Sequence, residues 1–320
     1  MKLVVLDGHA LNPGDLSYSC LEEFGEVTVY ERTDSQEEAI ARIGDSEIVL
    51  LNKVPVTKEL LDRCPGIRLI CVMATGYNVV DTEGCAQRGI PVTNVPSYGT
   101  AAVAQFTMAL LLELCHRVGL HDRDVHRGGW QKADCFTYWL TPQVELAGKT
   151  MGIIGLGSIG MAVARLAKAF GMNILAYNRS QSPQGREIAT YVDLDTLLSQ
   201  SDVVSLHCPL FPETQGIINA RSLSKMRHDA LLINTARGAL INEQDLVQAL
   251  TSGKLRGAAL DVTCQEPIDP NNPLLSCKNC IITPHMAWAP LESRQRLLNT
   301  VVDSIRGFLN GTPKNVVNGV

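Results

Sequence analysis

The feature that most constrains the fold of this 320-residue chain is a glycine-rich segment near its middle. A hydrophobic run from Thr150 leads into Gly155, Gly157 and Gly160, and a helical pattern follows as far as Phe170. Between a strand and a helix, the first glycine permits a tight turn, the second lets a pyrophosphate approach the backbone, and the third allows close packing. The phosphates bind at the helix N-terminus, where free N–H groups stabilise negative charge. The segment therefore predicts a dinucleotide-binding site.

Short β-branched runs alternate with amphipathic stretches along the whole chain, which predicts α/β structure with parallel sheets. The length favours two domains, and a complete domain fits before the glycine segment. We expect two Rossmann-like domains: a discontinuous substrate domain (1–98 and 286–320) and an inserted dinucleotide-binding domain (99–285). Helices are expected at residues 100–117, which are apolar on nearly every face, and at 291–309, which carry one apolar stripe. Strands are expected at residues 3–6, 27–30, 48–51, 69–72, 91–94, 152–155, 174–177, 203–207, 230–234, 257–261 and 281–284.

The composition limits the kinds of molecule that the protein is expected to bind. A formal charge of -5 without a dense Lys/Arg block argues against nucleic acid and anionic membranes as partners. The N-terminal apolar run is too short for a signal peptide, and residues 103–112 are too few to cross a bilayer. Ten scattered cysteines fit a reducing compartment. Cys277 and Cys280 lack a second ligand pair at zinc-site spacing, so we expect a turn there and no metal. We expect a cytoplasmic protein that binds small molecules.

Three segments after the glycine motif place chemically active side chains at expected strand ends. They carry Arg237, then Asp261 and Glu266, then His285. Ligands of a doubly wound sheet bind beyond the carboxyl ends of its strands, so these side chains should share one cleft. Arginine, carboxylate and histidine together suit the reduction of a 2-oxo acid. The guanidinium binds the substrate carboxylate, the imidazolium donates a proton as hydride arrives, and the protein carboxylate orients the imidazole.

The order of these motifs, GLGSIG, NTARG, LDV with EP, and TPH, resembles the D-isomer specific 2-hydroxyacid dehydrogenase family over essentially the whole chain. The resemblance implies that Arg237 binds substrate, that Glu266 is the partner carboxylate and that His285 is the acid/base. It also places Thr75 and Gly76 at the substrate carboxylate. The positions that it implies for the dinucleotide, beyond the three glycines, are Val103, Ser158, Ile159, His207, Cys208, Pro209, Thr235, Ala236, Arg237, Asp261 and His285.

Within the family, three segments look most like the glycerate dehydrogenase (hydroxypyruvate reductase) members: residues 11–16, residues 74–78 and His285-Met-Ala-Trp288. The resemblance thus implies reduction of hydroxypyruvate to D-glycerate and of glyoxylate to glycolate, with Trp288 near the substrate, and a homodimer. One alternative is a broader D-lactate-type dehydrogenase. Another is a non-catalytic, dinucleotide-sensing corepressor-like protein, which would not need the proton-transfer pair.

Two further segments predict specificity. Tyr138 and Trp139 lie in an aromatic stretch just before the glycine segment. We expect Trp139 or Tyr138 either to close a small pocket, in cis or from a dimer partner, or to pack in a dimer interface. Asn178, Arg179 and Ser180 follow the second strand where an NAD-specific site carries a carboxylate. A neutral side chain followed by arginine predicts a preference for NADP(H), with NAD(H) possible. In the alternative, Arg179 merely covers the adenine and both cofactors work.

Overall fold

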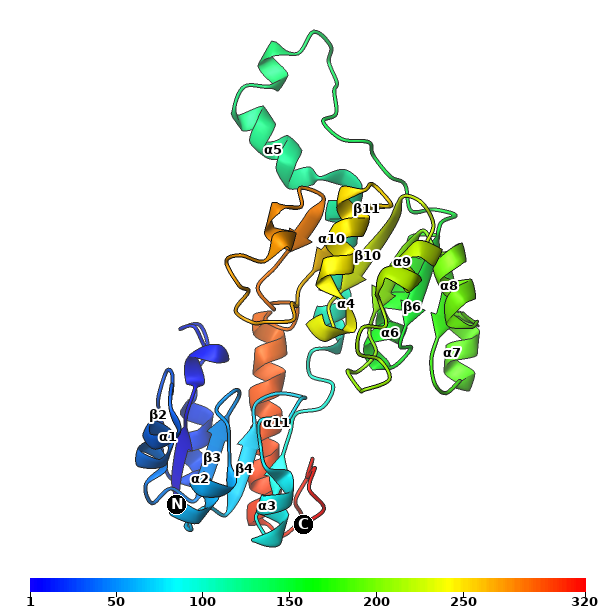
Figure 1. Ribbon diagram of the computed structural model, residues 1–320. Helices are drawn as coiled ribbons and strands as arrows, with labels where there is room; N and C mark the ends of the chain where they lie inside the picture. Colours follow the sequence, from blue (N-terminus) through cyan, green and yellow to red (C-terminus); the bar gives the residue numbers. More distant parts are fainter. The chain divides into compact units, whose positions relative to one another are not determined.

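The computed structural model describes residues 1–320 and divides into two α/β units (Figure 1). The first unit comprises Met1–Gly99 and Trp288–Val320, and the second comprises Thr100–Ala287. The units therefore meet in the chain at Gly99 and Ala287, where the sequence suggested 98 and 285. Each unit contains one parallel sheet with helices on both faces, which confirms the expected fold class.

The first unit has a five-stranded sheet in the order β2-β1-β3-β4-β5. Strands β1, β3, β4 and β5 are largely buried, by α1–α3 on one face and by α11 on the other, whereas the edge strand β2 is mostly exposed. Helix α11 follows its predicted bounds because its apolar stripe, which includes Leu297, Val301 and Ile305, packs on the sheet. The strands are β1 (Lys2–Val5), β2 (Glu26–Val29), β3 (Ile48–Leu51), β4 (Leu69–Val72) and β5 (Val92–Thr93), and the helices are α1 (Gln36–Ile43), α2 (Lys58–Arg63), α3 (Thr82–Gln87) and α11 (Leu291–Leu309).

The second unit has a seven-stranded sheet in the order β12-β11-β10-β9-β6-β7-β8. Successive side chains of β6 point to opposite faces, so Ile153 joins the core under α4 and α6 while Ile154 joins the core under α8–α10. The strands are β6 (Thr150–Ile154), β7 (Asn173–Tyr177), β8 (Thr190–Tyr191), β9 (Val203–Leu206), β10 (Ala230–Asn234), β11 (Leu255–Leu260) and β12 (Cys280–Ile282). The helices are α4 (Thr100–His116), α5 (Val118–His126), α6 (Ser158–Ala169), α7 (Pro183–Ile188), α8 (Leu194–Gln200), α9 (Ala220–Lys225) and α10 (Glu243–Thr251).

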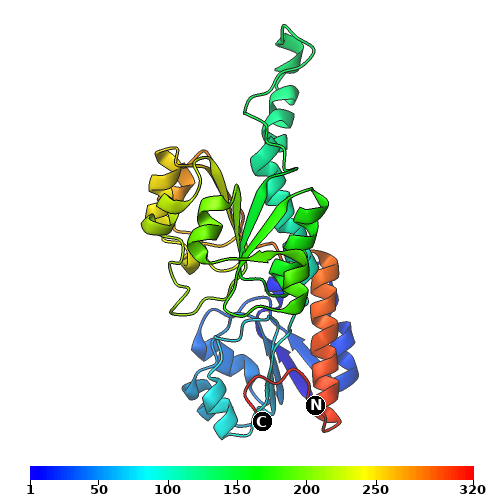
Figure 2. The same ribbon diagram turned by 90° about the vertical axis from the view of Figure 1, so that its right-hand side faces the viewer.

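Residues 118–140, which comprise α5 and the chain that follows it, form a projecting segment that extends away from the sheet of the second unit in both views (Figures 1 and 2). The chain turns sharply at Arg117, whose left-handed φ of 48° separates α4 from α5. No residue of α5 is buried, so its sequence has no apolar stripe that could have predicted it. No single helix has the length and apolar character of a membrane span, and α4 with α5 reaches them only as a pair bent by 57°.

Candidate active site

The glycine motif lies at the carboxyl end of β6, in the interior of the seven-stranded sheet. Gly155 has a φ of +98°, and a Cβ there would lie 2.4 Å from the backbone nitrogen of Cys208. Both the backbone conformation and the lack of space therefore exclude a side chain. A Cβ on Gly160 would lie 2.2 Å from the carbonyl oxygen of Gly155, because α6 packs tightly against the turn. By contrast, nothing lies within 4 Å of a Cβ on Gly157. This glycine keeps open a space that the protein itself does not fill.

Helix α6 begins without a side-chain cap. Its N-cap is Gly157, which offers no side-chain acceptor to the first-turn N–H groups. Four other helices of the same unit are capped by hydrogen bonds from their own N-cap side chains, namely Ser182 for α7, Asp193 for α8, Asn219 for α9 and Asn242 for α10. An uncapped helix N-terminus beside an open glycine fits the pyrophosphate of a dinucleotide, which would accept from those N–H groups.

The polar end of β7 stabilises this turn. Asn178 Oδ1 accepts the backbone N–H of Leu156 at 3.2 Å, and Asn178 Nδ2 donates to the carbonyl of Ser180 at 2.6 Å. The side chain thus acts as both acceptor and donor, which an aspartate could not do. Arg179 and Ser180 are exposed. The three predicted cofactor-specificity residues therefore lie together next to the glycine turn.

The turn after β10 presents Arg237. Buried Asn234 shapes it, because Asn234 Oδ1 accepts the N–H of Ala236 and Asn234 Nδ2 donates to the carbonyl of Arg237. The Arg237 side chain is exposed, and one of its N–H groups donates to the carbonyl of Ala236 at 2.7 Å. A Cβ on Gly238 would lie 2.0 Å from the carbonyl of Thr263, so glycine is required where this turn passes the next one.

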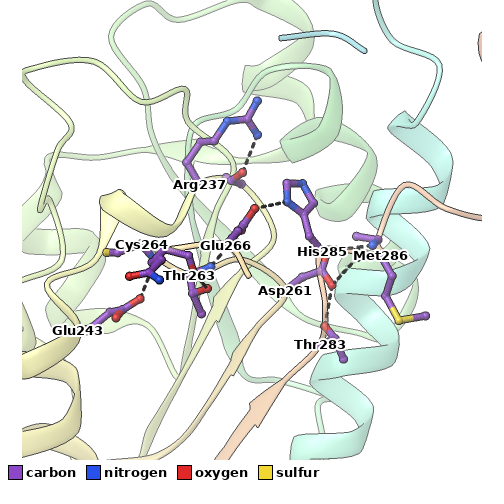
Figure 3. A network of polar contacts seen from close by, with 12 residues as sticks. Arg237, Glu243, Asp261, Thr263, Cys264, Glu266, Thr283, His285 and Met286 are labelled. Atoms are coloured by element: carbon purple, nitrogen blue, oxygen red, sulfur yellow. Dashed lines mark hydrogen bonds and ion pairs between the residues drawn. The ribbon is translucent and has the colours of Figure 1, made fainter. Parts of the chain in front are cut away.

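The segment that carries His285 is fixed by Asp261 at the end of β11. Asp261 is only 1% exposed, and its carboxylate accepts the Thr283 hydroxyl at 2.6 Å and the N–H groups of Met286 at 2.9 Å and Ala287 at 2.8 Å (Figure 3). The backbone N–H of His285 donates to the Asp261 carbonyl. His285 itself has a φ of +51°, which a non-glycine residue adopts only when its surroundings enforce it.

His285 and Glu266 form a hydrogen-bonded pair. The ring nitrogen Nδ1 lies 2.7 Å from Glu266 Oε2, and the two side chains are 35% and 37% exposed (Figure 3). An ionised carboxylate only accepts, so Nδ1 is the ring nitrogen that donates to it. Glu266 Oε1 accepts the backbone N–H of Thr263 at 3.2 Å. Figure 3 shows Arg237 in the same neighbourhood. The structure thus brings the three predicted catalytic residues together at the carboxyl ends of neighbouring strands.

The other predicted cofactor residues lie along the same edge. His207 follows β9, its Nε2 lies 2.8 Å from the Ser205 hydroxyl, and burial lowers its pKa to about 4, so the ring is neutral at pH 7. Buried Thr235 has its hydroxyl 3.0 Å from that of Thr107 on α4. The remaining members are placed as follows: Val103 on α4, Ser158 and Ile159 at the start of α6, Cys208 and Pro209 after β9, and Ala236 after β10.

Three predicted substrate residues belong to the first unit. Thr75 and Gly76 follow β4, and the Thr75 hydroxyl donates to the carbonyl of Val95 at 2.8 Å. Trp288 is half-buried and packs edge-on against Tyr98, with ring centroids 6.4 Å apart.

Trp139 lies on the projecting segment of the second unit and is 66% exposed. The next residues, Thr141 and Pro142, line a cavity of about 480 Å³ together with residues at the amino ends of β10–β12, such as Leu255. His285 follows the opposite, carboxyl end of the same sheet. The fold of this unit is therefore not compatible with Trp139 closing the His285 site in cis.

Sequence reasoning missed residues that hold the catalytic groups in place. Asn234 and Thr283 form the hydrogen bonds described above, and Glu243 at the start of α10 bonds the loop that contains Glu266. A buried asparagine at the end of an apolar strand was a usable signal for Asn234. No local pattern pointed to Glu243, because its partners lie 21 and 29 residues further along the chain.

Comparisons with known proteins agree with this geometry. Residues 108–287 match the family model described as D-isomer specific 2-hydroxyacid dehydrogenase, NAD binding domain. The chain is 54% identical to a hydroxypyruvate reductase of Blautia hydrogenotrophica, with 99% of this chain and 100% of that protein covered. It is 40% identical to a glycerate dehydrogenase of Methylorubrum extorquens, with 99% and 98% covered. The solved structure of an acyclic imino acid reductase in complex with NADPH and D-Arg is similar, with a TM-score of 0.85, 30% identity, and 99% and 100% covered.

The chain therefore belongs to the D-isomer specific 2-hydroxyacid dehydrogenase family. It is an oxidoreductase that transfers hydride between a nicotinamide cofactor and small 2-oxo acids.

Proposed function

We propose that this enzyme reduces hydroxypyruvate to D-glycerate and glyoxylate to glycolate, with Arg237, Glu266 and His285 as its catalytic residues. The observation that carries the proposal is the 2.7 Å contact between His285 Nδ1 and Glu266 Oε2 beside Arg237. The names of the relatives with 54% and 40% identity support these substrates. Thr75, Gly76 and Trp288 are proposed substrate contacts of the first unit, which would then be the substrate domain, with the second unit as the cofactor domain.

Each group of the trio has a defined task. The Arg237 guanidinium binds the substrate carboxylate as a fork and polarises the ketone. A nicotinamide, when bound, supplies the hydride. His285 Nε2 holds the proton that goes to the ketone oxygen, which becomes the hydroxyl of the product. Glu266 fixes the ring orientation and stabilises the charged imidazole. A non-catalytic sensor would not need this pair.

A substrate panel tests the proposal. Loss of the absorbance of the reduced nicotinamide should be fastest with hydroxypyruvate and glyoxylate, and slower with pyruvate and bulkier 2-oxo acids. Glu266→Gln should move the alkaline fall of turnover to lower pH, because the imidazolium loses its negative partner. A panel dominated by pyruvate would favour the D-lactate-type alternative, and an unshifted pH profile would argue against coupling of Glu266 to proton transfer.

We propose that NADPH is preferred over NADH. The neutral Asn178 side chain is committed to Leu156 and Ser180, so no carboxylate faces the position of the ribose 2′ group. Arg179 and Ser180 are exposed next to it and would bind a 2′-phosphate. One charged hydrogen bond corresponds to roughly 10-fold to 150-fold discrimination. The test is kcat/KM for both cofactors in the wild type and in Asn178→Asp with Arg179→Ala. A wild-type preference for NADH, or a double variant that still prefers NADPH, would contradict it.

We propose that the enzyme is a cytoplasmic homodimer in which the projecting segment contacts the second copy. Large apolar side chains are exposed on this segment, which is typical of an interaction surface: Val118, Trp130, Phe136, Trp139 and Leu140. All ten cysteines are free, which suits the cytoplasm. Trp139→Ala should admit bulkier 2-oxo acids if Trp139 lines the partner's pocket. If it only weakens the dimer, measured by light scattering, the pocket role is wrong.

A further inference from the structure

The loop that contains Glu266 is held at two points by a second carboxylate. Glu243 is the first residue of α10, and its Oε1 accepts the backbone N–H of Cys264 at 2.7 Å (Figure 3). Its Oε2 accepts from Asn272 Nδ2 at 2.8 Å. The two oxygens of Glu243 therefore connect α10 to both ends of the loop 264–272, on either side of Glu266.

Residues 264–267 are exposed and belong to no helix or strand. Exposed loops with few buried contacts open most readily. Two neighbouring hydrogen bonds are local, from Thr263 N–H to Glu266 and from the Thr263 hydroxyl to the carbonyl of Gln265. The Cys264 thiol adds only a weak contact, 3.7 Å from the carbonyl of Ile241. Glu243 therefore supplies two strong side-chain hydrogen bonds that join this loop to α10.

The His285 side of the pair has its own anchor, since Asp261 binds the segment 283–287 through three donors. A 2.7 Å hydrogen bond between Glu266 and His285 requires both segments to be fixed. Asp261 fixes one of them and Glu243 fixes the other. The thiol of Cys264 lies against Glu243 as well, and burial together with this carboxylate raises the pKa of Cys264 to about 11. The thiol therefore remains protonated at neutral pH.

We propose that Glu243 is a positioning residue for proton transfer: it fixes the loop 264–272 so that Glu266 stays within hydrogen-bond distance of His285. This inference rests on the proposed roles of Glu266 and His285. Glu243 acts on the pair through the backbone of Cys264 and the amide of Asn272.

The chemistry of the two contacts provides a rescue experiment. Both partners of Glu243 are donors, so Glu243→Gln keeps one acceptor and turns an N–H group towards the other donor. Asn272→Asp supplies the missing acceptor, because one aspartate oxygen can accept from the introduced amide while the other keeps the N–H of Leu274, which Asn272 Oδ1 accepts now. The double variant thus restores both contacts with the donor and acceptor exchanged on one of them.

We expect Glu243→Gln to lower kcat for hydroxypyruvate by about 10-fold to 100-fold, since a small misplacement of a catalytic group has effects of this size. The dissociation constant for NADPH, measured by fluorescence, should change by less than about 3-fold. The alkaline fall of turnover should move to lower pH, as expected for Glu266→Gln. The variant that also contains Asn272→Asp should recover most of kcat and the original pH profile.

Other outcomes would overturn the inference. If Glu243→Gln lowers the melting temperature and kcat but leaves the pH profile unchanged, Glu243 is merely structural. The same conclusion follows if the double variant recovers the melting temperature without recovering kcat. His285→Ala, measured in parallel, separates the two proposals. If turnover in His285→Ala is near normal, the catalytic trio and this inference are both wrong. If His285→Ala loses most of its turnover while Glu243→Gln keeps the kcat and pH profile of the wild type, only this inference is wrong.

Discussion

The two sheets differ in the residue that follows the strand at the same topological position. In the first unit, β1 lies between β2 and β3, and in the second, β6 lies between β7 and β9. Ligands of such sheets bind at this switch of strand order. Asp7 follows β1 and is buried. Its carboxylate accepts hydrogen bonds from the backbone N–H groups of Asn52 at 2.7 Å and Lys53 at 2.6 Å, both of which follow β3. After β6 stands Gly155, which lies against the backbone of Cys208 beyond β9.

The difference shows that the sheet alone does not create a cofactor site. In the first unit a side-chain carboxylate satisfies the backbone at the switch point, and only the short 3-10 helix Gly8–Ala10 follows. Burial raises the pKa of Asp7, although the hydrogen bonds from Lys53 and Asn52 oppose that shift. In the second unit glycines leave the corresponding position open, and the uncapped helix α6 follows. In the first unit a carboxylate of the chain takes the backbone donors at this position, whereas in the second unit the first-turn N–H groups of α6 have no side-chain cap.

The largest effect should come from placing a side chain at the open switch point. Gly155→Ala should weaken NADPH binding by more than about 100-fold, because its Cβ would lie 2.4 Å from Cys208 N and the residue would keep an unfavourable φ of +98°. Fluorescence titration measures the affinity. Gly148→Ala is the matched control, since Gly148 has a φ of +77° in the same unit but open space around its Cβ. Equal affinities of the two variants would show that the close approach at Gly155 is irrelevant.

Removing the carboxylate that follows β1 should affect stability and not NADPH binding. Asp7→Ala leaves the N–H groups of Asn52 and Lys53 without their acceptor and should cost about 1–3 kcal/mol in the free energy of unfolding. Asp45→Ala, which removes an exposed partner of Lys2, should lower the free energy of unfolding far less. Urea unfolding measures both, and the NADPH dissociation constant should stay unchanged. A parallel loss of NADPH affinity in Asp7→Ala would contradict the comparison.

The smallest effect concerns His207, just beyond β9 in the second unit. Burial lowers its pKa to about 4, from an ordinary value of 6.5. As the pH falls from 6.5 towards 4, the unfolded chain takes up a proton that the folded chain does not, so stability is lost in this window. At pH 5 the loss should be about 1–2 kcal/mol. His207→Gln should lose less stability than the wild type between about pH 7 and about pH 5 in urea unfolding. An equal loss in both proteins would show that His207 is not responsible.

Much of the fold followed from local patterns. Strands β3, β4 and β10 have the predicted bounds because each is a continuous apolar run, and helix α11 has them because its apolar stripe spans the whole helix. The two-residue strand β8 and helix α5, which has no buried residue, were missed, since neither has a hydrophobic period long enough to detect. Their existence depends on tertiary context.

The residues of the candidate site also fall into two groups, those that local motifs indicated and those that they did not. The glycines, Arg237, Glu266 and His285 stand in short motifs with characteristic spacing, so the sequence could indicate them. The positive φ of His285 and the roles of Asp261 and Glu243 could not be predicted, because each depends on hydrogen bonds between segments far apart in the chain. Trp139 illustrates the converse: the aromatic pattern was visible, but its place at the opposite end of the sheet from His285 was not.

In the proposed mechanism His285, oriented by Glu266, donates the proton, while the glycine turn binds the cofactor independently. This mechanism is tested most directly by turnover and NADPH affinity in His285→Ala. We expect kcat with hydroxypyruvate to fall by roughly 100-fold or more, while the NADPH dissociation constant stays within about 3-fold of the wild type. Near-normal turnover in this variant, or a loss of turnover matched by an equal loss of cofactor affinity, would contradict it.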